Sequence, residues 1–343
     1  MQLRFDMRDH TAVSASSASV TPAYKPKTEP PTERDGVRQT FAEINRLIGL
    51  DEVKTLFYEV YAYTTVQQRR KREQLKAEPT VLHAIFSGNP GSGKTTVARL
   101  MAKLYREMGV LSKGHLVEVE RADLVGEFIG HTAQRTREQI RKSLGGVMFL
   151  DEAYSLTRGG EKDFGREAID ALVKGMEDHK NDFVLVLAGY RREMQEFLES
   201  NPGLRSRFPL HVDFADYSTE ELLQIADCMY QERQYQPSEA AMRELERCLL
   251  HAKASLPAAV RGNARSVRNL VEASLRMQAV RLTESVTAAM QNKEMLCRIE
   301  AVDICSAARR LAQKRQEKCA AGEIIYMNHG EDKTAEEISI AYD

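Results

Sequence analysis

One segment of eight residues constrains the fold of this chain more than any other: Gly88-Asn89-Pro90-Gly91-Ser92-Gly93-Lys94-Thr95. It fits the pattern G-x-x-x-x-G-K-[ST]. An apolar strand candidate at residues 82–87 precedes it, and a segment with helical spacing at residues 94–108 follows. Glycine permits a tight turn whose backbone N–H groups converge, and the helix start adds the positive end of its dipole. The segment therefore predicts a phosphate-binding loop between a strand and a helix.

Two side chains of this segment predict its ligands, ATP and Mg²⁺. The ammonium group of Lys94 would lie against the β- and γ-phosphates, and the hydroxyl of Thr95 would ligate Mg²⁺. Successive backbone N–H groups of the loop would point at phosphate oxygens. The predicted nucleotide-binding residues of this segment are Gly88, Asn89, Pro90, Gly91, Ser92, Gly93, Lys94, Thr95 and Thr96.

Two carboxylates end a later apolar run. Residues 147–150 are Val-Met-Phe-Leu, and Asp151 and Glu152 follow directly. A buried parallel strand that ends in acids places them at the carboxyl edge of the sheet, where open α/β sheets bind ligands. Asp151 would hold Mg²⁺ through its water shell, and Glu152 would orient or deprotonate the attacking water. Together with the glycine-rich segment, this pair favours a nucleotide hydrolase over a simple binder.

The arrangement of apolar residues predicts the fold class. Five short apolar or alternating runs occur at residues 82–87, 115–120, 147–150, 183–188 and 210–214. Segments with helical spacing separate them. This alternation predicts an α/β fold, with a five-stranded parallel sheet flanked by helices on both faces.

The pattern changes after Asp216, where the strand candidates stop. Ser218-Thr219-Glu220-Glu221 is a capping box that opens a helix, and further helices are expected from residues 238, 263 and 301. Both ends of the chain are too polar to bury much apolar surface. We therefore expect a disordered tail at 1–36, a large α/β ATPase domain at 37–215, a small all-helical lid domain at 216–320 and a loose polar tail at 321–343.

Composition argues against several classes of function. The formal net charge is −1, so no overall basic field favours nucleic acid. Apolar runs such as residues 183–189 are far shorter than the roughly 18–20 residues of a membrane span, and the first residues lack the pattern of a secretory signal. The five cysteines have no CxxC spacing, which favours reduced thiols. We expect a cytoplasmic protein without a membrane span.

Several motifs in order resemble the CbbX/CfxQ branch of the AAA+ ATPases. They are Gly130-His131-Thr132-Ala133, residues 145–156, Leu187-Ala188-Gly189-Tyr190 and residues 201–208. The branch holds stage V sporulation protein K, red-type Rubisco activases and the ATPases of type VII secretion. The length of the chain, and the lack of a helical-repeat domain in front, favour the first two, and we expect the chain to be more like the sporulation protein than like the activases.

The resemblance implies a homo-oligomer, a ring hexamer with ATP between subunits. It implies an arginine finger before the last strand that reaches the γ-phosphate of the neighbour: Arg207 is the first choice and Arg205 the second. Arg265, at a helix start in the lid, would reach the γ-phosphate of its own subunit, and Ile48-Gly49 would pack on adenine. The first-sensor residue stays unassigned, because residues 186–190 contain no Asn or Thr.

The loop Phe128-Ile129-Gly130 is the candidate for contact with a substrate. In the AAA+ rings that this chain resembles, the loop lines a central pore and its aromatic side chain grips a polypeptide. Phe128 and Ile129 would supply apolar contact, and Gly130 would permit movement. The alternative is that Phe128 belongs to the core.

Three functions remain open at this point. The first is an ATP-driven remodeller that pulls on an unknown protein client, with a sporulation role or red-type Rubisco activation as its setting. The second is a nucleic-acid motor, which the apolar loop with Glu127 and the near-zero net charge disfavour. The third is a nucleotide-gated scaffold that threads nothing.

Overall fold

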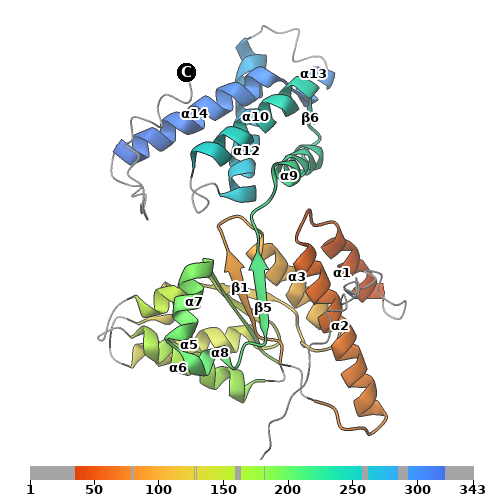
Figure 1. Cartoon of the computed structure of the whole chain (residues 1–343), viewed down its shortest axis with the longest axis vertical. Coiled ribbons are helices and arrows are strands. Elements are labelled where there is room, and N and C mark those ends of the chain that lie inside the picture. Colours follow the sequence, from red (N-terminus) through yellow and green to blue (C-terminus); the bar gives the residue numbers. More distant parts are fainter. Residues whose placement is uncertain are drawn as a thin grey trace, which may run out of the picture.

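Five parallel strands form the sheet of the larger domain (Figure 1). The computed structural model describes residues 35–78, 81–126, 128, 130–158, 164–180, 182–256, 262–284 and 293–320. The strands lie in the order β2-β3-β4-β1-β5, and every neighbouring pair is parallel. Their bounds are β1 Ala84–Gly88, β2 Leu116–Val119, β3 Val147–Leu150, β4 Val184–Gly189 and β5 Leu210–Phe214.

Helices cover both faces of this sheet, as Figure 1 shows. Side chains of β1 alternate between the two layers: Ala84 and Phe86 join the core beneath α1, α2 and α3, and Ile85 joins the core beneath α5, α6 and α7. The inner strands β3 and β4 are buried along their whole length, which explains their uninterrupted apolar sequences. The helices are α1 Asp35–Asn45, α2 Asp51–Arg72, α3 Lys94–Glu107, α4 Arg121–Leu124, α5 His131–Ser143, the 3₁₀ turn η1 Ala153–Thr157, α6 Gly165–Asp178, α7 Arg191–Glu199 and α8 Pro202–Arg205.

The predicted sheet is confirmed, and one predicted boundary is wrong. Asp35 and Gly36, which the sequence analysis assigned to the N-terminal tail, belong to α1. This helix starts early because Val37 is buried and because Gly36 lies against the side chain of Glu107 on α3. Residues 1–34 and 321–343, the remainder of the two predicted tails, lie outside the described residues.

The second domain is helical, as predicted. Its core lies between α9 Thr219–Glu232, α10 Glu239–Ser255, α12 Asn263–Glu284 and α14 Ala301–Ala320. The predicted capping box is present, because Glu221 N donates to Ser218 Oγ over 3.1 Å and Ser218 N donates to Glu221 Oε2 over 2.7 Å. This lid lies beyond the carboxyl ends of β1 and β5 (Figure 1).

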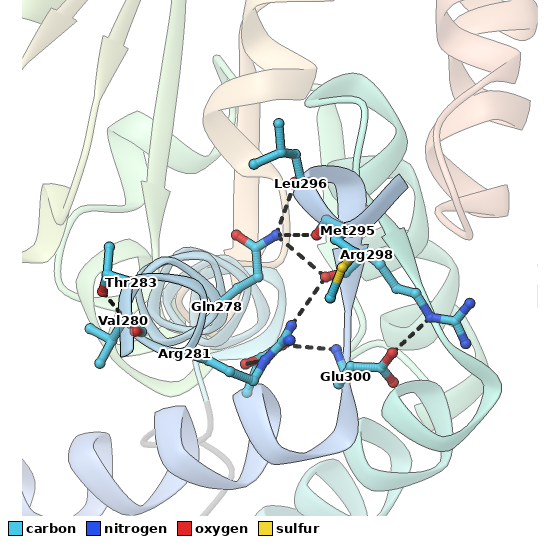
Figure 2. A network of polar contacts seen from close by, with 9 residues as sticks. Gln278, Val280, Arg281, Thr283, Met295, Leu296, Arg298 and Glu300 are labelled. Carbon is cyan, nitrogen blue, oxygen red and sulfur yellow. Dashed lines mark hydrogen bonds and ion pairs between the residues drawn. The ribbon is translucent and has the colours of Figure 1, made fainter. Parts of the chain in front are cut away.

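A buried polar network fixes the far end of the lid (Figure 2). Gln278 is 3% exposed, and its Nε2 donates to the carbonyl oxygens of Met295, Leu296 and Arg298 at 2.9–3.4 Å. Arg281 pairs with the buried Asp303 at 2.8 and 2.9 Å. Three elements here were not predicted from the sequence: α13 Lys293–Cys297 and the two-residue parallel strands β6 Gln236–Pro237 and β7 Arg298–Ile299. The bonds from Gln278 satisfy carbonyl groups at the end of α13 and one carbonyl of β7.

Candidate functional site

The glycine-rich segment forms a closed loop between β1 and α3. Gly91 and Gly93 have φ angles of 72° and 97°, in the left-handed region that favours glycine, and Lys94 begins α3 directly afterwards. The Lys94 Nζ donates to the carbonyl oxygens of Gly88 over 2.7 Å and Asn89 over 2.9 Å. The loop thus curls around its own lysine at the N-terminus of a 14-residue helix.

The charge of Lys94 lies in a partly dehydrated setting. Burial lowers the pKa of Lys94, while the nearby carboxylates of Asp151, Asp216 and Glu152 act in the opposite direction. The neighbouring Arg265 lowers the pKa of Lys94 further. An anion bound at the loop would stabilise both cations, because a nearby opposite charge favours the charged form. The electrostatics therefore fit a phosphate group.

The two acids follow β3 at the same edge of the sheet. Asp151 N extends the sheet by donating to Val119 O over 3.1 Å, and Asp151 Oδ1 accepts from Glu152 N over 3.0 Å. Glu152 has a φ of 47°, a left-handed conformation that costs a side-chain-bearing residue on the order of 1–3 kcal/mol. Glu152 O accepts a hydrogen bond from Ser155 N, and this bond closes the first turn of η1. The chain therefore turns sharply at Glu152 as it leaves the sheet.

A single pocket brings the loop, the acids and the lid together. Most of the predicted ligands line it, including Lys94, Thr95, both acids and Arg265. Gly88, Asn89 and Ser92 do not, because Gly88 packs against Phe214 O, Asn89 Nδ2 bonds Asp216 and Ser92 is buried. The lining residues are Pro90, Gly91, Gly93, Lys94, Thr95, Thr96, Asp151, Glu152, Tyr154, Gly189, Tyr190, Ala264, Arg265 and Arg268.

Two tyrosines and a second lid arginine belong to the pocket but were not predicted. The rings of Tyr154 and Tyr190 stack with centroids 5.9 Å apart. Burial raises the pKa of Tyr190, and the charges of Glu152 and Asp151 raise it further. Tyr190 directly follows β4, so it lies at the carboxyl edge of the sheet, as the two acids do. The reasoning that located the acids could therefore have located Tyr190 as well. Arg268 lies three residues after Arg265, the spacing that places two side chains on one helix face.

The lid touches the phosphate loop directly. Ala264 N donates to Gly91 O over 3.2 Å, and a Cβ on Gly91 would lie 2.2 Å from Gly262 O. Asn263 is 5% exposed and has a φ of 44°. Its Nδ2 donates to Asp216 Oδ1 over 2.8 Å and to Pro90 O over 3.3 Å. The start of α12 is therefore bonded both to the loop and to the linker between the domains.

The predicted adenine-binding pair lies at the same junction but outside the pocket lining. Gly49 has a φ of 61°, and a Cβ there would lie 2.3 Å from Glu221 Oε1. Tyr217, whose hydroxyl donates to Ser92 O over 3.3 Å, lies next to Gly49. Ile48-Gly49 thus faces the linker that joins β5 to α9. Its contact with adenine stays a prediction.

The two candidate finger arginines also lie outside the pocket of their own subunit. Arg205 ends α8 and is exposed. Arg207 pairs with Glu177 of α6 and donates from Nη1 to Gly203 O over 2.6 Å. The structure therefore does not bring these arginines to the acids or to Lys94.

The predicted pore residue Phe128 is exposed. Its side chain is 64% accessible, so it is not a core residue, and its ring is nearly perpendicular to that of His131, with the ring centroids 5.5 Å apart. Gly130 has a φ of 82° and precedes α5, and apart from its chain neighbours no atom of the described residues lies within 4 Å of the position of a Cβ. Ile129 lies outside the described residues.

Neither a metal cluster nor a membrane span appears in the described ranges. No group of three or more His, Cys, Asp or Glu side chains there is arranged to hold a metal ion. A bilayer would need a longer and more apolar helix than any found there. Thr95 and Asp151 line the pocket with oxygen donors. This set fits Mg²⁺, which proteins commonly hold through one or two carboxylates plus the phosphates of the substrate.

Comparison with known proteins agrees with this geometry. Residues 84–215 match the family described as ATPase family associated with various cellular activities (AAA), and residues 218–314 match the AAA lid domain. Solved structures of RuvB mutants from Thermotoga maritima share the fold, with TM-scores of 0.50 and 0.51, identities of 19% and 18%, and coverage of 87% of this chain and 84% and 83% of theirs.

Relatives in sequence are much more similar. Stage V sporulation protein K of Bacillus subtilis is 57% identical over 70% of this chain and 74% of its own length. Protein CbbX of Cereibacter sphaeroides is 44% identical over 73% and 81%, and the CfxQ homologue of Pyropia yezoensis is 42% identical over 79% and 90%. The chain is therefore an ATP-hydrolysing AAA ATPase of the CbbX/CfxQ branch.

Proposed function

We propose that the pocket hydrolyses ATP with the roles predicted from the sequence. Lys94 and the backbone N–H groups of the loop hold the phosphates, and Thr95 and Asp151 would hold Mg²⁺. Bound Mg²⁺ neutralises charge on the phosphate oxygens. Glu152, which lines the pocket beside Asp151, orients the attacking water and accepts its proton. Arg265 and Arg268 of the lid add positive charge from the same subunit.

The active enzyme is a ring, in our proposal a hexamer, in which Arg207 acts on the pocket of the next subunit. The observation that carries this proposal is the absence of both Arg205 and Arg207 from the pocket lining of their own subunit. A guanidinium at the γ-phosphate is worth about 10³–10⁵ in rate in other phosphoryl-transfer enzymes. A single subunit lacks that contribution.

The ring remodels a protein client through its centre. The exposure of Phe128 supports this proposal, because a large aromatic side chain at 64% exposure is available for contact with a partner. Among the relatives, the sporulation protein shares more identity than CbbX or CfxQ. A remodelling role of the sporulation type is therefore favoured over activation of red-type Rubisco. The cytoplasmic location stays a prediction.

Dilution tests the shared site. ATP turnover per subunit should fall steeply as the protein is diluted below the concentration at which rings persist, measured beside sedimentation velocity. Arg207→Ala should abolish turnover while rings persist, and Arg205→Ala should retain most of it. Turnover per subunit that stays constant down to monomers would refute the proposal.

A further inference from the structure

A carboxylate of α6 holds the side chain of Arg207. Both Nε and Nη2 of Arg207 donate to Oε1 of Glu177, with the Nε contact at 3.2 Å. Nη1 donates to the carbonyl oxygen of Gly203 over 2.6 Å. A guanidinium carries five N–H donors, so two of them make no bond to the residues that the structure describes. The side chain of Arg207 is 35% exposed, so part of it reaches solvent.

The backbone beneath this side chain is fixed as well. Leu204 and Phe208, on either side of Arg207, are 3% and 1% exposed and belong to the core of the domain. Arg207 N also donates to Leu204 O over 2.9 Å. By contrast, the exposed side chain of Arg205 makes no hydrogen bond or ion pair with the part of the chain that the structure describes. Contacts therefore fix the orientation of the Arg207 side chain, whereas none of them fixes that of Arg205.

Stability does not account for the pair. Glu177 is 58% exposed, and ion pairs at such positions contribute little to the free energy of unfolding. An arginine side chain loses considerable rotamer freedom when it binds a partner, and a contact that orients it beforehand removes part of that loss. Glu177 can therefore orient the guanidinium before the neighbouring subunit arrives.

We propose that Glu177 is a positioning residue for Arg207. It holds the guanidinium so that the two free N–H donors face the phosphate of the neighbouring subunit. This inference rests on the proposed role of Arg207 as a finger that acts between subunits. Glu177 itself touches neither the pocket of its own subunit nor, in this proposal, the nucleotide.

Homogeneous variants give the first test. Glu177→Ala should lower kcat about tenfold, because misplacement of a catalytic group is costly, and should leave the KM for ATP and the rings unchanged. Glu177→Gln keeps an acceptor oxygen at the same reach and should restore most of kcat. Asp178→Asn, the adjacent exposed carboxylate of α6, serves as the matched control and should match the wild type. An unchanged or raised kcat for Glu177→Ala would overturn the inference, as would a loss that follows loss of rings.

Mixed rings separate this inference from the proposed function. Wild-type subunits are mixed with an excess of Glu152→Gln subunits, which cannot hydrolyse ATP but still offer Arg207 to the neighbour. A second substitution, Glu177→Ala, in the Glu152→Gln subunits should lower the turnover of the wild-type subunits below that seen with Glu152→Gln alone. Arg207→Ala as the second substitution should lower it most. If only the Arg207 double variant lowers turnover, the finger stands and the role of Glu177 fails. If neither does, the finger role fails, and the role of Glu177 fails with it.

Discussion

Nδ2 of Asn263, at the start of the lid helix α12, donates to Oδ1 of Asp216 in the linker over 2.8 Å. The same carboxylate oxygen accepts from Asn89 of the phosphate loop over 2.9 Å. One oxygen thus joins the three parts whose relative positions must change if the lid moves over the nucleotide. A movement of the lid relative to the phosphate loop would therefore have to break at least one of these two bonds.

Replacing Asn263 should weaken this junction in two separable steps. Asn263→Gly accommodates the φ of 44° but loses the bonds to Asp216 and Pro90 O, and should lower the free energy of unfolding by about 1–2 kcal/mol. Asn263→Ala adds backbone strain of about 1 kcal/mol or more. Urea unfolding measures both variants. Equal stability of Asn263→Ala and the wild type would contradict the structure.

Gly91→Ala should lower the free energy of unfolding more than Gly130→Ala, although both glycines have a positive φ. Its Cβ would meet Gly262 O at 2.2 Å, so the lid must move away from the loop. Gly130→Ala is the matched control, because its φ of 82° imposes similar strain but its Cβ would meet no atom within 4 Å among the described residues beyond its chain neighbours. We expect Gly91→Ala to cost about 1–3 kcal/mol more than the control and to weaken ATP binding. Calorimetric unfolding and nucleotide titration test the pair.

Glu152→Gln should stop hydrolysis without preventing binding. The amide cannot accept a proton, so kcat should fall by about 10²–10⁴. The affinity for ATP should persist, because Lys94 and the loop are unaltered. Glu59→Gln, at an exposed carboxylate of α2, is the control and should leave turnover unchanged. Retention of turnover by Glu152→Gln would remove Glu152 from the proposed mechanism.

Phe128→Ala should separate remodelling from folding. The side chain is 64% exposed, so the free energy of unfolding should change by no more than about 0.5 kcal/mol. Stimulation of ATP turnover by a protein client, and remodelling of that client, should be lost. Val66→Ala, which removes a side chain 55% exposed on α2, should retain both. Full remodelling by Phe128→Ala would favour the scaffold without threading.

Stability should fall in mild acid because of His83. This residue is 5% exposed, and burial lowers its pKa from 6.5 to about 4. Its Nδ1 accepts from Leu185 N over 3.0 Å, so the folded state holds the neutral ring. Between pH 6.5 and about 4 the unfolded chain binds the extra proton, so stability is complete above pH 6.5 and is lost as the pH falls through this window. The loss should reach about 3 kcal/mol.

A variant isolates that contribution from other acid effects. His83→Asn offers an acceptor oxygen near the position of Nδ1 but does not titrate. Its free energy of unfolding should therefore depend less on pH between 6.5 and 4 than that of the wild type. Parallel curves for the two proteins would show that His83 does not control the acid limit.

The sequence predicted the features that depend on short segments. The conformations of the loop before α3 and of the acids after β3 depend on a few neighbouring residues in the sequence. The buried strands are recognisable as apolar runs. Contacts between distant segments were not predictable. The stacking of Tyr154 on Tyr190, the approach of Gly262 to Gly91 and the pairing of Glu177 with Arg207 each join residues that only the folded chain brings together. The elements that Gln278 secures were missed for the same reason.

The bonds from Lys94 to the carbonyl oxygens of Gly88 and Asn89 have a consequence for nucleotide binding. An ammonium group has three N–H donors, so these two bonds still leave one donor for a phosphate oxygen. The loop thus places the long lysine side chain before a nucleotide arrives, and binding does not have to order it. Part of the affinity of the site is therefore stored in the loop itself.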